Sequence, residues 1–152
     1  MTKDRPSSIR FVKQDKRPLA ANVKAIKGGL VACDENGFYR PSTGATSQVN
    51  VGARFRETVD NTGGANGARF AEVEYFREKE LFLCENHSGG GSHPVVIADR
   101  ERPCFQLDDQ TVTGDDTKSY AGTVYDVVTG EGVWVDYSAG PRGPQGEPGE
   151  DA

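Results

Sequence analysis

Short runs in which apolar and polar residues alternate constrain the fold of this chain more than any other feature. The run Val49–Val59 alternates, with apolar Val49, Val51, Ala53 and Phe55 separated by polar residues or glycine, which is the period of a β-strand with one buried face. The run Asn61–Gly67 then breaks the pattern with residues that tolerate positive φ. With 19 glycines in 152 residues, short strands joined by turns are favoured over long amphipathic helices. The sequence therefore predicts an all-β fold.

The same signals predict about nine or ten short strands. The turn Asp34–Gly37 predicts a hairpin, with strands expected at residues 22–26, 30–33 and 38–40. In the alternating run 69–75 we place Phe70 and Tyr75 on the buried face, together with Ala71 or Val73. Further strands are expected at residues 81–84, 104–107, 120–128 and 132–137, while residues 94–98 form either a strand or a helical turn. Strands of this number and spacing predict a small β-barrel or sandwich-like domain.

The chain divides into three regions. Residues 1–18 are polar and charged and predict an extended basic N-terminal arm, and residues 19–138 hold the strands of one β-rich domain. Residues 139–152 contain four consecutive Gly-X-Y triplets that begin at Gly140, the repeat that a collagen triple helix requires. Because four triplets are too few to hold a triple helix unaided, we expect a flexible collagen-like tail.

The net charge of −5 conceals opposite charges at the two ends. The first 27 residues hold eight bases and two acids, whereas residues 99–152 hold four bases and twelve acids. The basic arm lacks interleaved aromatic residues apart from Phe11, so contact with an acidic protein surface is favoured over nucleic acid, the alternative being a solvated terminus. The expected contact residues in this arm are Arg5, Arg10, Phe11, Lys13, Lys16 and Arg17.

Trp134 is a further candidate contact. It lies between Val133 and Val135 in a predicted strand, so one face of that strand is either exposed or covered by a partner. Tryptophan is frequent among residues that dominate binding energy, although a place in the core explains it equally well.

The strongest candidate for metal chemistry is the set Cys84, His87, His93 and Cys104, whose thiolate and imidazole groups are zinc ligands. Their spacing is irregular, and buried cysteines with loop histidines are the favoured reading. The aspartates at residues 108, 109, 115 and 116 fit turn capping better than a cation loop. No nucleophile elbow or phosphate-binding loop is present in the sequence, so we expect no catalytic residue, no metal and no cofactor.

The number of cysteines and the hydropathy of the sequence indicate the cellular compartment in which the protein is expected to be made. Three cysteines leave at least one unpaired, and residues 1–27 lack the apolar stretch of a signal peptide. No run approaches the roughly 18 apolar residues of a membrane span. We therefore expect a soluble protein made in a reducing cytoplasm, with no membrane partner.

A series of short motifs resembles the capsid cement, or head decoration, proteins of tailed bacteriophages. The resemblance covers residues 19–137 and depends on the order of the motifs, each of which is weak alone. The motifs are Lys27–Ala32, Val51–Ala53, Val59–Ala65, Val73–Glu74, Cys104–Phe105, Asp108–Val112, Ala121–Gly122 and Trp134–Asp136.

This resemblance implies a structural virion protein without enzymatic activity, made in the cytoplasm of a bacterial host. Such a protein binds the exterior of the expanded capsid, cements neighbouring major capsid proteins and stabilises the head against the pressure of packaged DNA. With a collagen-like tail added, the resemblance also makes self-association as a trimer on the capsid attractive.

Two alternatives of other classes remain. The first is an adhesion or binding module that displays the collagen-like tail on a virion or cell surface, which longer Gly-X-Y arrays or an aromatic carbohydrate platform would favour. The second is a small enzyme or metalloprotein that uses the cysteines and histidines above, which stoichiometric zinc would reveal.

Overall fold

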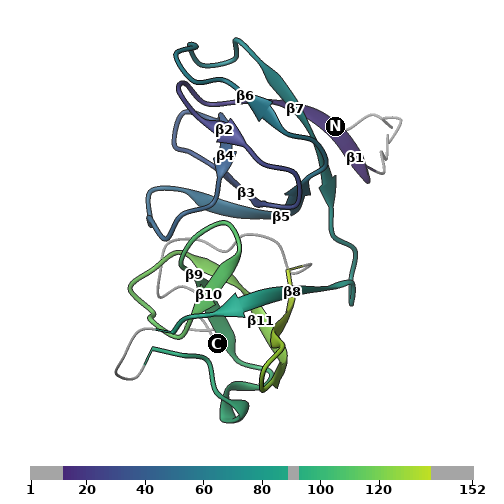
Figure 1. Ribbon diagram of the computed structural model, residues 1–152, viewed down its shortest axis with the longest axis vertical. Coiled ribbons are helices and arrows are strands. Elements are labelled where there is room, and N and C mark those ends of the chain that lie inside the picture. The colour runs from purple at the N-terminus through teal and green to yellow at the C-terminus, as the bar shows by residue number, and fades with distance from the viewer. Residues whose placement is uncertain (1–11, 89–92, 138–152) are drawn as a thin grey trace, which may run out of the picture.

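The computed structural model describes residues 12–88 and 93–137 and is almost entirely β (Figure 1). The predicted all-β class is confirmed. Among the described residues, no helix has the length and apolarity that a membrane span requires. The elements in chain order are β1 (Gln14–Pro18), β2 (Lys24–Ala25), β3 (Leu30–Cys33), β4 (Tyr39–Pro41), β5 (Val49–Phe55), β6 (Val59–Asp60), β7 (Phe70–Tyr75), β8 (Leu81–Asn86), the 3-10 turn η1 (Ile97–Asp99), β9 (Pro103–Gln106), β10 (Thr111–Thr113), β11 (Tyr120–Val128) and β12 (Gly132–Asp136).

The first half of the chain forms an N-terminal lobe, residues 12–75, built on one antiparallel sheet. Its strand order is β1-β7-β5-β3-β4, and β2 pairs with β6 in a separate short ladder. A bridge from Leu19 to Tyr39 joins the chain after β1 to the opposite edge strand, β4. The sheet therefore curls almost into a ring around a core that includes Phe55 and Val73, both fully buried.

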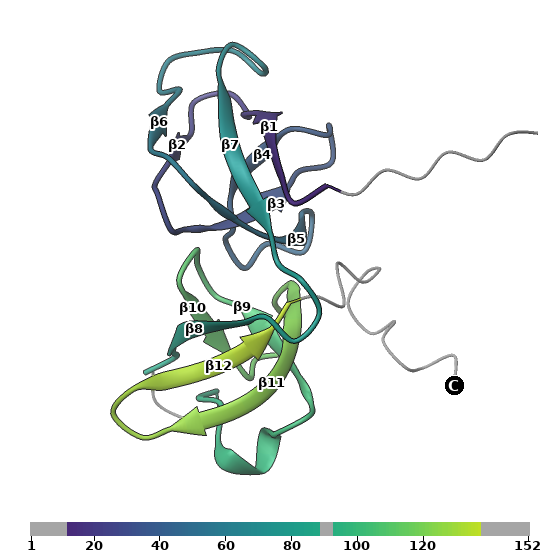
Figure 2. The same ribbon diagram turned by 90° about the vertical axis from the view of Figure 1, so that its right-hand side faces the viewer.

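The second half forms a barrel lobe, residues 81–137, which is a closed five-stranded barrel (Figure 2). The order is β10-β8-β12-β11-β9, and β9 pairs again with β10 to complete the ring. Strand β10 runs parallel to β8, whereas the other pairs are antiparallel. The barrel core gathers Val112, Val124, Val133 and Val135, none of which is exposed to solvent. A closed ring leaves no long sheet edge open.

Polar contacts fasten the two lobes at their junction. Asn50 of β5 is 3% exposed, and its Nδ2 donates to Ser119 Oγ at 3.1 Å and to the Tyr120 carbonyl at 2.6 Å. Its Oδ1 accepts from the Ser42 hydroxyl. Leu30 belongs to β3 but packs in the barrel core, and its amide donates to the Asp109 carbonyl at 2.9 Å. The lobes are thus joined by buried groups from both sides.

Several local expectations differ from the structure. Residues 14–18, predicted as part of the arm, form the edge strand β1 paired with β7. Phe70, predicted to be buried, is 50% exposed, because the register of β7 turns Ala71 and Val73 inward instead. The buried residues form two clusters, and residues 97–99 adopt the helical turn, one of the two alternatives given for residues 94–98. The hairpin around residues 34–37 is confirmed between β3 and β4.

Candidate interaction surfaces

Trp134 lies on the outer face of the barrel lobe. Its neighbours Val133 and Val135 are fully buried, so alternation along β12 points the Trp134 side chain outward, where it is half-buried. Register places it opposite Leu83 of β8 on one side and Asp126 of β11 on the other. Leu83 is 37% exposed. We call the outward residues Leu81, Leu83, Trp134 and Asp126 the Trp134 face.

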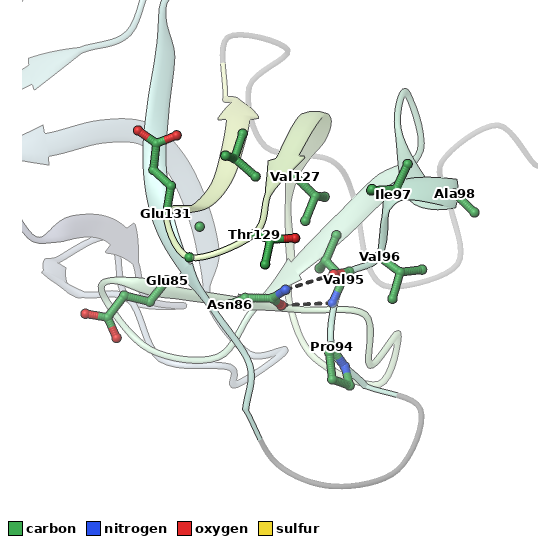
Figure 3. A pocket seen from close by; sticks show the side chains of 13 residues that line it. Glu85, Asn86, Pro94, Val95, Val96, Ile97, Ala98, Val127, Thr129 and Glu131 are labelled. Atoms are coloured by element: carbon green, nitrogen blue, oxygen red, sulfur yellow. Dashed lines mark hydrogen bonds between the residues drawn. The ribbon is translucent and has the colours of Figure 1, made fainter.

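The far end of the barrel lobe carries an apolar groove of about 840 Å³ (Figure 3). One wall is the segment before and within η1, and the other is the β11–β12 hairpin. The groove is lined by Glu85, Asn86, Pro94, Val95, Val96, Ile97, Ala98 and residues 127–132. Val96 and Ile97 are each 53% exposed and Val128 is 37% exposed. The sequence contained a signal for this wall, the apolar run 94–98, but not its partner across the groove.

Asn86 fixes the wall that carries Val96. Its Nδ2 donates to the Val95 carbonyl and its Oδ1 accepts from the Val95 amide, both at 2.8 Å (Figure 3). A side-chain amide thereby replaces a strand neighbour for this segment. Val95 itself is 2% exposed and packs into the barrel core. Val95 therefore anchors the segment that leads into η1, whereas the side chain of Val96 remains exposed in the groove.

The described basic residues of the predicted arm are bound within the molecule. Lys13 Nζ donates to the Tyr75 carbonyl and to Glu80 Oε1, both at 2.9 Å. Lys16 Nζ lies 3.4 Å from Glu57 Oε2. These contacts lower the charge that Lys13 and Lys16 present to a partner. Arg5, Arg10 and Phe11 lie outside the described residues.

Arg17 is held against Tyr39. The guanidinium carbon lies 4.5 Å from the centroid of the Tyr39 ring, and Nη2 donates to the Tyr39 hydroxyl. That hydrogen bond raises the pKa of Arg17, while partial burial opposes the rise. With Asp15 Oδ2 also at 3.6 Å, the side chain joins β1 to β4 rather than projecting toward a partner.

The structure separates the four candidate zinc ligands into two environments. Cys84 and Cys104 lie inside the barrel core, where burial raises the pKa of Cys84 to about 12 and that of Cys104 well above its ordinary value. Cys84 Sγ lies 3.3 Å from the Tyr137 hydroxyl. His87 and His93 instead stack at 5.8 Å between ring centroids, and His87 Nδ1 lies 2.9 Å from Thr113 Oγ1. Among the described residues, no group of three His, Cys, Asp or Glu side chains gathers as metal ligands.

The aspartates of the last third cap turns at the lobe junction and at the barrel. Asp115 Oδ1 accepts from the Thr117 hydroxyl at 2.6 Å and from the Thr117 amide at 3.0 Å, and these hydrogen bonds, the hydroxyl first, lower the pKa of Asp115. Asp109 differs, because it is half-buried against Gly29, where a Cβ would lie only 2.7 Å from its carboxylate oxygen. Burial raises the pKa of Asp109, and the charge of Asp108 adds to the rise.

We expect Asp109→Asn to raise the melting temperature at neutral pH. A carboxyl whose folded pKa is raised stabilises the fold when protonated, and that stability is lost as pH rises through the folded pKa. Asparagine keeps the shape without the charge, so the gain should be present at neutral pH and vanish below the ordinary aspartate pKa of 3.8. Thermal denaturation at both pH values checks this, with Asp116→Asn at an exposed position as control. An Asp109→Asn protein no more stable than wild type at neutral pH would contradict it.

Comparison with known proteins adds no relative. The chain matches no protein-family model, no curated protein and no solved structure. The surfaces above are therefore interpreted from their own chemistry and from the motifs of the sequence.

Proposed function

We propose that this protein is a structural virion protein that binds the exterior of the expanded phage capsid and cements neighbouring major capsid proteins. The observation that carries the proposal is the outward position of Trp134 beside the exposed Leu83 on a closed barrel. The order of sequence motifs supplies the choice of a capsid as partner.

The Trp134 face has the composition of a contact surface. A tryptophan offers a large apolar ring and one N–H donor, and such residues dominate many protein interfaces. Asp126 lies at the edge of this face and forms an ion pair with Arg100 at 2.9 Å, which places charge at that edge. An apolar centre with a polar border is the usual arrangement of a specific interface. Contacts from Arg5, Arg10 and Phe11 remain a further prediction.

A rigid contact surface suits cementing, because many copies each add a modest binding energy to the assembled shell. Each copy bound across adjoining capsid subunits lowers the free energy of the closed shell relative to the open one. A barrel whose core is fully buried presents the Trp134 face with little conformational entropy to lose on binding.

The test is cosedimentation with expanded, undecorated capsids of the virus that encodes the protein, with unexpanded procapsids as control. We expect saturable binding to expanded capsids only. Absence of binding to either shell would overturn the proposal and favour the adhesion class.

We expect Trp134→Thr to weaken capsid binding by about tenfold or more, because loss of a central aromatic anchor removes about 2 kcal/mol or more. The matched control is Phe70→Thr, which removes another exposed aromatic ring from a strand, but in the N-terminal lobe. Circular dichroism should show both variants folded. Equal weakening by the two variants, or none by Trp134→Thr, would remove the Trp134 face from the interface.

A further inference from the structure

The apolar groove of the barrel lobe is a second contact surface, separate from the Trp134 face. Val96 and Ile97 expose about half of their surface there, on a wall that Asn86 holds in place. Exposed apolar side chains gathered in a groove, rather than scattered singly, mark a binding site for another chain. Two separate segments line the groove, the one that leads into η1 and the β11–β12 hairpin (Figure 3).

The groove borders an open strand edge. Strand β11 pairs with β9 only as far as Thr123. Beyond it, the Val124 amide donates to the Arg102 carbonyl at 2.9 Å and the Val124 carbonyl accepts from the Glu101 amide at 2.7 Å. No strand among the described residues pairs with Tyr125–Val128 on that side, although β12 covers the other side. Such an edge accepts an extended segment by strand addition.

The charge of the groove indicates what kind of extended peptide segment could bind there. The two charged residues that line it, Glu85 and Glu131, are both acids, and neither carboxylate has an ion-pair partner in the described part of the chain. An extended segment with apolar side chains and arginine or lysine is therefore complementary to it.

One of the two ends of the chain has this composition. Residues 1–11 carry Lys3, Arg5 and Arg10 against Asp4, and they include the alternating sequence Ile9-Arg10-Phe11. Residues 138–152 carry Arg142 against three acids, at 147, 150 and 151, and their apolar residues are only alanine and proline. The acidic groove therefore favours the N-terminal segment over the tail.

Chain length favours a second copy over the same chain as the source of this segment. The Lys13 carbonyl accepts from the Tyr75 amide at 2.8 Å, which fixes Lys13 at the lobe junction. Ile9 is four residues from this point and spans about 13 Å at most when extended. The groove begins at Glu85 and Asn86, at the far end of β8, and this strand alone is roughly 17 Å long.

We propose that the groove binds Ile9–Phe11 of a second copy of this protein. Ile9 and Phe11 contact Val96, Ile97 and Val128, and Arg10 lies at the rim beside Glu85 and Glu131. The contact joins two different surfaces, so it links copies head to tail and closes a ring or extends a chain of them. It goes beyond capsid binding and does not depend on it.

Two full-length variants test the proposal by complementation. Phe11→Glu changes the segment and keeps the groove, whereas Val96→Glu changes the groove and keeps the segment. Analytical ultracentrifugation over a range of concentrations should show that each variant self-associates at least about tenfold more weakly than wild type. An equimolar mixture should regain association as a one-to-one complex, because one intact segment and one intact groove remain.

The matched control is Val49→Glu, which adds the same charge at a valine that is 41% exposed in the N-terminal lobe. It should self-associate as wild type does. The proposal is overturned if wild type stays monomeric at the highest concentration reached, if Phe11→Glu and Val96→Glu associate as wild type does, or if their mixture associates no better than either alone. Capsid binding of the same variants is measured separately, so failure of this contact is distinguishable from failure of the cement function.

Discussion

Asn50→Asp should lower the free energy of unfolding by about 3 kcal/mol or more and split unfolding into two transitions. Asn50 is almost fully buried at the lobe junction, where its Nδ2 donates to Ser119 and to the Tyr120 carbonyl. Aspartate lacks both donors, so it places carboxylate oxygens against acceptors and buries an unpaired charge. The junction should fail before either lobe does.

Two spectroscopic signals separate the lobes in this experiment. Trp134 is the one tryptophan of the sequence and lies in the barrel lobe, so its fluorescence reports that lobe, whereas far-ultraviolet circular dichroism reports both. In urea the two signals should coincide for wild type and diverge for Asn50→Asp. The control is Asn36→Asp, the same change at an exposed turn. Coincident transitions of unchanged stability in Asn50→Asp would show that this contact does not couple the lobes.

Gly132→Ala should destabilise the barrel lobe by about 2–4 kcal/mol. Gly132 begins β12 with φ of 138°, and a Cβ there would lie 2.4 Å from the Cys84 carbonyl oxygen. That distance is too short for any side chain, and the oxygen belongs to the backbone of the paired strand β8. Alanine must therefore push β12 away from β8 at the open end of the barrel.

The neighbouring glycine gives the control for this substitution. Gly130 also has positive φ, 83°, but a Cβ at that position meets nothing within 4 Å. Gly130→Ala therefore adds backbone strain of about 1 kcal/mol without a clash. Chemical denaturation of both variants, followed by Trp134 fluorescence, measures the difference. Equal destabilisation by the two substitutions would show that close approach of β12 to β8 is not the cause.

Strand-forming residue patterns and turn-forming residues predicted much of the fold, because both depend on residues close together in the sequence. Residues 120–128 and 132–137 are rich in β-branched and aromatic residues and form β11 and β12 almost as expected. The Asp34–Gly37 turn forms with Asp34 Oδ1 accepting from the Asn36 amide. Strand β1 escaped prediction because a charged edge strand such as Gln14–Pro18 has no apolar alternation. Its bases Lys16 and Arg17 find partners far along the chain, at Glu57 and Tyr39, which no local pattern specifies.

The candidate surfaces were also hard to predict, because they depend on pairing between strands that are far apart in the sequence. The parity of Val133 and Val135 indicated that Trp134 has an outward face, but its neighbour Leu83 follows from the register of β8. Leu30 and Val31 are adjacent in sequence and belong to different cores, so apolar pattern alone could not divide the chain into two lobes. The groove needs both η1 and the β11–β12 hairpin, which are brought together only when the barrel closes.

Both described ends of the chain lie at the waist between the lobes, and this determines how the molecule bears tension (Figure 2). Lys13 is bonded to Tyr75 and Glu80, and Tyr137 donates from its buried hydroxyl to Gln106 at 3.0 Å. A pull on the chain at Lys13 therefore acts first on these junction contacts, whereas a pull at Tyr137 acts directly on the barrel core, where the Tyr137 side chain is buried. We therefore expect the two ends to differ under tension, because displacing Tyr137 disrupts the barrel core whereas releasing Lys13 breaks only contacts at the junction.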